Sequence, residues 1–109
     1  MAGKFILSKS GTAFRFTLVA GNAEKILSSE SYTAKAGATN GIESVKKNAL
    51  DDARYSKLLS KSNQPYFVLK AGNNEIIGTS QMYASSEARD KGIEAVKNAA
   101  PAAPVVEQP

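Results

Sequence analysis

The chain has 109 residues, of which 42% are hydrophobic and 22% charged, so we expect one small globular domain and exclude wholesale disorder. It contains neither Cys nor His, which excludes disulfides, thiolate metal sites and the usual near-neutral general base. Seven Lys and Arg residues against three Glu residues within residues 1–50 account for the whole net charge of +4. Because no apolar run reaches bilayer length and the first residues are too polar for a signal peptide, we expect a cytoplasmic protein without membrane contact.

The strongest pattern in the sequence is an internal duplication. When residues 16–49 are laid over residues 67–100, 15 of the 34 positions are identical without a gap. This match predicts two tandem repeats, the first over residues 3–50 and the second over residues 54–100. A lone unit of about 50 residues buries little core, so we expect both repeats to merge into a single domain over residues 1–100.

In the first repeat, apolar residues alternate with polar ones at residues 4–9 and again at residues 14–20, as in half-buried strands. Gly21-Asn22 predicts a turn into a third strand over residues 24–29. The period then changes to that of an amphipathic helix, with an apolar stripe at Ala38, Ile42, Val45 and Ala49.

The second repeat follows the same plan, with strands expected over residues 55–60, 66–71 and 75–80. Its helical stripe consists of Ala88, Ile93, Val96 and Ala100. Pro65 cannot donate to a ladder, so its strand should begin at or after it. We expect Ser85 or Ser86 to cap the second helix and Thr33 to cap the first.

Gly41 and Gly92 stand at the same register inside the two predicted helices. Glycine in a helix interior costs about 1 kcal/mol relative to alanine. Its recurrence indicates a packing requirement, such as close approach of the helix to the sheet.

Together these elements predict an α+β fold. Two tandem β-β-β-α repeats should form one antiparallel six-stranded sheet with two helices on one face, related by a pseudo-twofold axis. Residues 101–109 carry three prolines and no periodicity, so we expect a disordered tail.

The chain resembles the YegP family. The resemblance rests on Phe-Arg-Phe-Thr-Leu at residues 14–18, Ala-Gly-Asn-x-Glu at 20–24, Gly-Ile-Glu-Ser-Val-Lys at 41–46 and their second copies, and it covers residues 3–100. It implies the same tandem arrangement, which family members with one copy would reach by dimerising. It implies no activity, because the family is uncharacterised.

A sheet covered on one face leaves the other face open. Four residues of the alternate period should lie there as an interaction face: Arg15, Lys25, Tyr66 and Lys70. We therefore expect a small non-catalytic binding module of otherwise unknown function, which uses this open face for a protein partner or for self-association.

The sequence leaves two other classes of function open. A weak single-stranded nucleic-acid binder would use the same basic residues, but one ring contributes only about 1–3 kcal/mol of stacking. A small enzyme would need Ser, Lys or carboxylate groups, for which Ser44 and Lys47 have suitable spacing although the second copy lacks both. The sequence indicates no catalytic residues, no metal ligands and no cofactor.

Overall fold

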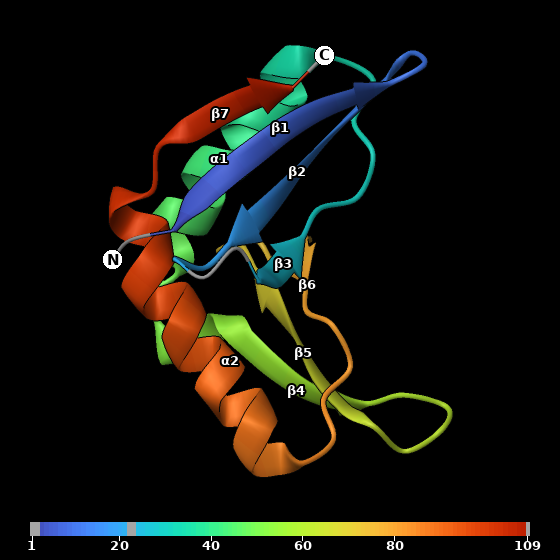
Figure 1. Ribbon diagram of the computed structural model, residues 1–109, viewed down its shortest axis with the longest axis vertical. Coiled ribbons are helices and arrows are strands. Elements are labelled where there is room, and N and C mark those ends of the chain that lie inside the picture. Colours follow the sequence, from blue (N-terminus) through green and yellow to red (C-terminus); the bar gives the residue numbers. More distant parts are fainter. Residues whose placement is uncertain (1–2, 22–23, 109) are drawn as a thin grey trace.

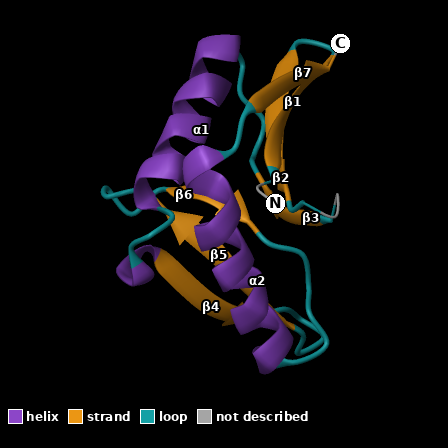
Figure 2. Cartoon of the chain, turned by 60° about the vertical axis from the view of Figure 1, so that its left-hand side comes forward, coloured by secondary structure: helices purple, strands orange, loops and turns teal. Residues whose placement is uncertain are grey.

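A computed structural model describes residues 3–21 and 24–108, which form one mixed sheet with two helices on the same side of it (Figures 1 and 2). The elements in chain order are β1 (Lys4–Ser10), β2 (Ala13–Val19), β3 (Lys25–Ser28), α1 (Lys35–Asn48), η1 (Asp52–Arg54), β4 (Tyr55–Leu59), β5 (Pro65–Lys70), β6 (Ile76–Thr79), α2 (Ser86–Ala99), η2 (Ala100–Ala102) and β7 (Val105–Gln108). Both repeats therefore have the expected β-β-β-α plan. Asn22, in the turn expected after β2, lies outside the described residues.

The strand order β4-β5-β6-β3-β2-β1-β7 places the two repeats end to end, joined at β6 and β3. The six strands of the repeats pair antiparallel, as expected, and Ser28 pairs with Thr79 at the join. An antiparallel join between equivalent strands is the arrangement of a pseudo-twofold axis. The prediction of six strands was wrong, because a seventh pairs parallel to β1.

The seventh strand also corrects the expectation of a disordered tail. Ala100 and Ala103 are buried in the core, and they direct residues 105–108 along the outer edge of β1 (Figure 1). An unpaired strand edge presents a row of free N–H and C=O groups, and two valines suit a strand that covers it. The prolines are compatible with this path, since Pro101 lies at the start of η2 and the Pro104 carbonyl accepts a hydrogen bond from the Phe5 N–H at 2.8 Å.

Each repeat uses one serine to extend its central hairpin. Ser29 Oγ accepts a hydrogen bond from the Phe16 N–H, and Ser80 Oγ accepts the equivalent bond from the Phe67 N–H, both at 2.9 Å. In each copy the serine directly follows the third strand and binds the second strand through its side chain, which accounts for its identity in both copies.

The helix starts differ between the repeats. Ser85 caps α2 as expected, because its Oγ accepts from the Ala88 N–H at 3.1 Å. The prediction of Thr33 for α1 was wrong: Ala34 is the N-cap residue, and it makes no side-chain cap bond. Strand β5 begins at Pro65, as expected.

The helical glycines make room for tyrosines. A Cβ added to Gly92 would lie 2.2 Å from the hydroxyl of Tyr83, whose ring stacks on Phe67. A Cβ added to Gly41 would lie 2.7 Å from the Tyr32 hydroxyl and 2.8 Å from the Phe16 ring. The expected packing requirement is confirmed, since each helix approaches the sheet closely enough to exclude a methyl group.

The core is shared by the two repeats. One cluster of buried residues includes Phe16 and Ile42 of the first repeat and Phe67 and Ile93 of the second. Helix α1 contacts β5 and β6 as well as its own β2, and α2 contacts β2 and β3. Each helix therefore covers strands of both repeats.

Candidate functional site

The four residues predicted for the open face all lie on strands, with alternation that directs them away from the helices. Arg15 and Lys25 are exposed, whereas Tyr66 and Lys70 are half-buried. The structure does not bring the four together. Arg15 on β2 and Tyr66 on β5 are separated by β3 and β6, which is roughly 14 Å across the sheet at the usual strand spacing.

The open face is more apolar at the β4 end than the four predicted residues suggest. Leu58 of β4 pairs directly opposite Tyr66 of β5 and keeps 39% of its surface exposed. Val68, next along β5 on the same face, is nearly buried. This end of the sheet therefore offers an apolar surface beside an edge strand, and Leu58 was missed because its importance depends on β4 being at the edge.

A groove of about 580 Å³ opens between this edge strand and α2. Its walls are Tyr55 and Lys57 of β4, Asp52 of η1, and Asp90, Ile93, Glu94 and Lys97 of α2. None of these residues belongs to the site predicted from the sequence.

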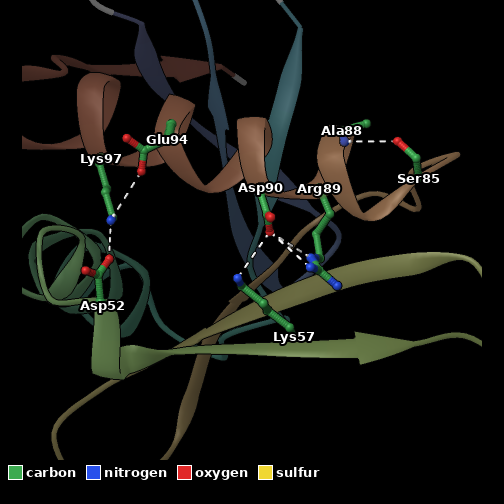
Figure 3. A network of polar contacts seen from close by, with 8 residues as sticks. All are labelled: Asp52, Lys57, Ser85, Ala88, Arg89, Asp90, Glu94 and Lys97. Carbon is green, nitrogen blue, oxygen red and sulfur yellow. Dashed lines mark hydrogen bonds and ion pairs between the residues drawn. The ribbon is translucent and has the colours of Figure 1, made fainter.

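Ion pairs line the groove in two groups (Figure 3). Asp90 of α2 accepts from Lys57 of β4 at 3.2 Å and from Arg89 at 3.0 and 3.1 Å. Hydrogen bonds from Arg89 and then Lys57 lower the pKa of Asp90. These contacts favour the ionised carboxylate along the groove, and because the pairs are exposed, solvent screens them strongly.

The second group joins α2 to η1. The Lys97 ammonium donates to Asp52 and also pairs with Glu94 at 3.2 Å (Figure 3). The hydrogen bond to Asp52 is the main cause that raises the pKa of Lys97. This ammonium lies 6.0 Å from the centre of the Tyr55 ring, so a cation lies over an aromatic ring that lines the groove.

Tyr55 provides that ring and is fixed on two sides. Its hydroxyl donates to the Ala49 carbonyl at 2.6 Å, and its ring meets Phe67 edge-on. Burial, and then the charges of Asp52 and Glu94, raise the pKa of Tyr55. The phenol therefore stays neutral throughout the physiological range and serves as a fixed part of the groove lining.

The backbone of β4 presents hydrogen-bonding groups to this groove. Phe67 directs its N–H and C=O toward Ser80, on the β6 side of β5. Lys57, which pairs opposite Phe67, must therefore direct its own N–H and C=O away from β5, since opposed residues in an antiparallel ladder alternate in this way. No strand of the described part of the chain pairs with that edge.

In the first repeat, a strand covers the edge that corresponds to the free edge of β4. Phe5 and Leu7 of β1 pair with β2 as Tyr55 and Lys57 of β4 pair with β5. There β7 lies outside β1, with Val105 beside Phe5 and Glu107 beside Leu7, and Glu107 forms an ion pair with Lys35 of α1. Leu7, beside β7, is buried, whereas Lys57 at the uncovered edge is exposed.

The described residues were compared with two arrangements that could carry chemistry, a carboxylate metal site and the Ser44–Lys47 pair. They contain no group of three or more carboxylates placed to hold a metal ion. Ser44 and Lys47 share no hydrogen bond among the contacts of the described residues, although their spacing suggested one. No helix in the described ranges is long and apolar enough to cross a membrane.

Comparison with known proteins finds two matches to one family model. A domain of unknown function, DUF1508, matches residues 9–56 and again residues 60–107. The first match begins within the last residues of β1, and the second begins just after β4. Each match ends in the strand that follows the helix, which is β4 for α1 and β7 for α2. The tandem repeat is thereby confirmed, and the tail belongs to the second copy.

The chain is also similar to proteins along its whole length. It is 55% identical to a UPF0339 protein of Bordetella pertussis, over 99% of this chain and 97% of the relative, and 53% identical to YegP of Escherichia coli O157:H7, over 89% of each chain. The solution structure of a UPF0339 protein from Shewanella oneidensis, 52% identical, superposes with a TM-score of 0.92 over 98% of this chain and 92% of the other. That of YegP from Escherichia coli, 48% identical, gives 0.93 over 99% and 94%.

Proposed function

We propose a non-catalytic protein-binding function for this chain, on the premise that it belongs to the DUF1508 family, a family of unknown function. The observation that supports the proposal is the unpaired edge of β4, whose Lys57 backbone faces outward beside an open groove. Free strand edges recruit further strands, and several peptide-binding domains use such an edge. The surface at Leu58 and Tyr66 adds apolar area beside it.

The proposal moves the binding surface from the centre of the open face to its β4 end. Of the four residues predicted for the site, Tyr66 adjoins this edge, and Arg15 and Lys25 lie in the other repeat. We infer a non-catalytic role because the chain has no His and no Cys, and because the carboxylates along the groove are held in ion pairs.

A nucleic-acid partner is less well supported. Single-strand binders stack bases on several exposed rings. Among the eight aromatic residues of this chain, Tyr66 alone belongs to the outward-facing set on the strands, so base stacking would be confined to one position.

A peptide-library selection against the immobilised full chain tests the proposal. We expect selected peptides to bind the wild type and Lys57→Ala, which keeps the edge N–H, and to lose binding to Lys57→Pro, which removes it. Proline is tolerated in an edge strand where the N–H faces solvent, and circular dichroism would verify that the variant folds. Peptides that bind Lys57→Pro as tightly as the wild type would contradict a binding function at this edge.

A further inference from the structure

We infer that the groove between β4 and α2 accepts an extended segment of a partner protein, running parallel to β4, with an apolar residue beside Tyr55 and an acidic residue beside Lys57. This inference rests on the proposed binding function and adds the orientation and chemistry of the partner. It is carried by the internal symmetry of the chain, because β7 already occupies the equivalent place in the first repeat.

The backbone of β4 supports a parallel strand. In the first repeat, the outward N–H of Phe5 donates to the carbonyl of Pro104, and β7 then pairs in parallel from Phe5 to Ser8. In the second repeat, the N–H of Tyr55 is taken by Asp52 in η1. The N–H and C=O of Lys57 remain directed to the free edge, so an added strand would be anchored there.

The side chains beside that anchor define the pattern of the segment. Val105 and Glu107 lie beside Phe5 and Leu7 on the helix side of the sheet. In a segment bound at the equivalent position beside β4, the residue that corresponds to Val105 would lie against Tyr55 and Ile93, where an apolar side chain fits. The residue of the segment that corresponds to Glu107 would lie next to Lys57. An acidic side chain is favoured there, because opposite charges on neighbouring strands attract. There it would share the Lys57 ammonium with Asp90, near Arg89.

The frame of the family match agrees with this assignment. Each match ends in the strand after its helix, so β4 and β7 are repeat equivalents. By pairing register β1 and β4 are also equivalent. Strand β4 pairs with β5, so its equivalent β7 would pair with β2. That edge of β2 is already paired with β1, and β7 therefore pairs with the outer edge of β1. The corresponding outer position beside β4 has no occupant in the described chain.

A partner protein fits this position better than the tail of a second copy. The tail is held in its own chain by pairing to β1, by the Phe5–Pro104 hydrogen bond and by the ion pair of Glu107 with Lys35. An intramolecular site has a high effective concentration, so it outcompetes the same site on another molecule.

A blocked peptide with the sequence Ala-Pro-Val-Val-Glu-Gln serves as the probe, titrated into the ¹⁵N-labelled full chain. We expect amide shifts at Lys57, Leu59 and the groove side of α2, with slower hydrogen exchange of the Lys57 amide. Lys57→Glu should weaken binding about tenfold, and a peptide with Lys in place of Glu should restore it. Lys91→Glu, the same change on an exposed position of α2 outside the groove, should leave binding unchanged.

Spin labels on the peptide test its direction. A label at the N-terminus should broaden resonances near Tyr55, and one at the C-terminus should broaden those near Leu59. The reverse pattern would overturn the parallel assignment. Shifts confined to β1 and β7, unchanged binding to Lys57→Glu, or protection of Lys57 through dimerisation without peptide would each overturn the inferred occupant. Library peptides that require the Lys57 N–H but lack the acidic residue would leave the proposed function standing while this inference fails.

Discussion

At the scale of single residues, the positions that are identical in both copies serve packing and hydrogen bonding. The serines Ser29 and Ser80 bind the backbone of the neighbouring strand, and the glycines Gly41 and Gly92 admit a tyrosine beneath each helix. Burial is the main cause that raises the pKa of Tyr83, so its phenol stays neutral under the helix. These identities thus serve the fold, whereas the groove is lined both by identical residues, such as Glu94 and Lys97, and by residues that differ between copies, such as Lys57.

Gly92→Ala should destabilise the protein although alanine is the better helix former. The helix propensity gain is about 1 kcal/mol. The new methyl group would overlap Tyr83, and overpacking of this kind costs about 1–3 kcal/mol. We expect a net loss of about 1 kcal/mol by urea denaturation. The double variant with Tyr83→Phe should lose less than the sum of the single variants, and a raised midpoint for Gly92→Ala would refute the packing argument.

Ala34→Ser should stabilise the protein by supplying the cap that α1 lacks. The Ala34 backbone is extended, as is that of Ser85 at the start of α2. A serine N-cap is favoured over alanine by about 1 kcal/mol. Thermal unfolding should show a rise for Ala34→Ser and a fall of similar size for Ser85→Ala. A loss of stability in both variants would mean that the two helix starts are not equivalent.

At the scale of elements, the sequence predicts the six repeat strands and both helices, because each has a clear period of 2 or 3.6. It does not predict β7, whose four residues are all exposed and which has no core-facing alternation of its own. Its existence depends on a long-range fact, the free edge of β1, and local patterns do not encode such pairings. The N-cap of α1 was misassigned for a related reason. Thr33 and Ala34 are neighbours in the sequence, and only the backbone conformation decides which of them is the N-cap residue.

The two parts of the tail should contribute differently to stability. A chain ending at Ala103 loses β7, which buries little, so we expect it to fold with a loss of about 1–2 kcal/mol from a few hydrogen bonds. A chain ending at Ala99 also loses Ala100 and Ala103, which are buried against both helices, and should lose clearly more. Equal denaturation midpoints for the two truncations would contradict the assigned role of η2.

At the scale of the whole molecule, the join between the repeats departs from symmetry in one respect. Leu27 of β3 fills the space beside Gly78 of β6, where an added Cβ would lie 2.6 Å from the leucine side chain. These two positions correspond in the repeat alignment. A large side chain in one copy and a glycine in the other let the two repeats pack together at the join. The two copies are therefore complementary and not interchangeable.

A fragment of residues 1–50 should therefore fail to fold as a monomer. It keeps the first three strands and α1 but loses the half of the core supplied by Phe67, Leu69 and α2. Circular dichroism and sedimentation should show an unfolded chain or an associated one. A cooperative, monomeric unfolding transition would show that each repeat is an independent domain.

The candidate site illustrates the same limit of sequence reasoning. Alternation along the strands predicted one face for Arg15, Lys25, Tyr66 and Lys70, but it carries no information on which strands are neighbours. The groove depends on that neighbour order, because it exists where the edge strand and α2 meet without a covering strand. The one local clue is Lys57, a charged residue at the position where the first copy has Leu7.

Amide hydrogen exchange at Leu7 and Lys57 in the free full chain tests the central claim, which is that one of two equivalent strand edges is covered and the other is open. Both N–H groups point away from their hairpin partner, and β7 covers the first. We predict strong protection at Leu7, little at Lys57, and loss of the difference in a chain that ends at Ala103. Protection of Lys57 equal to that of Leu7 in the free, monomeric chain would contradict the account.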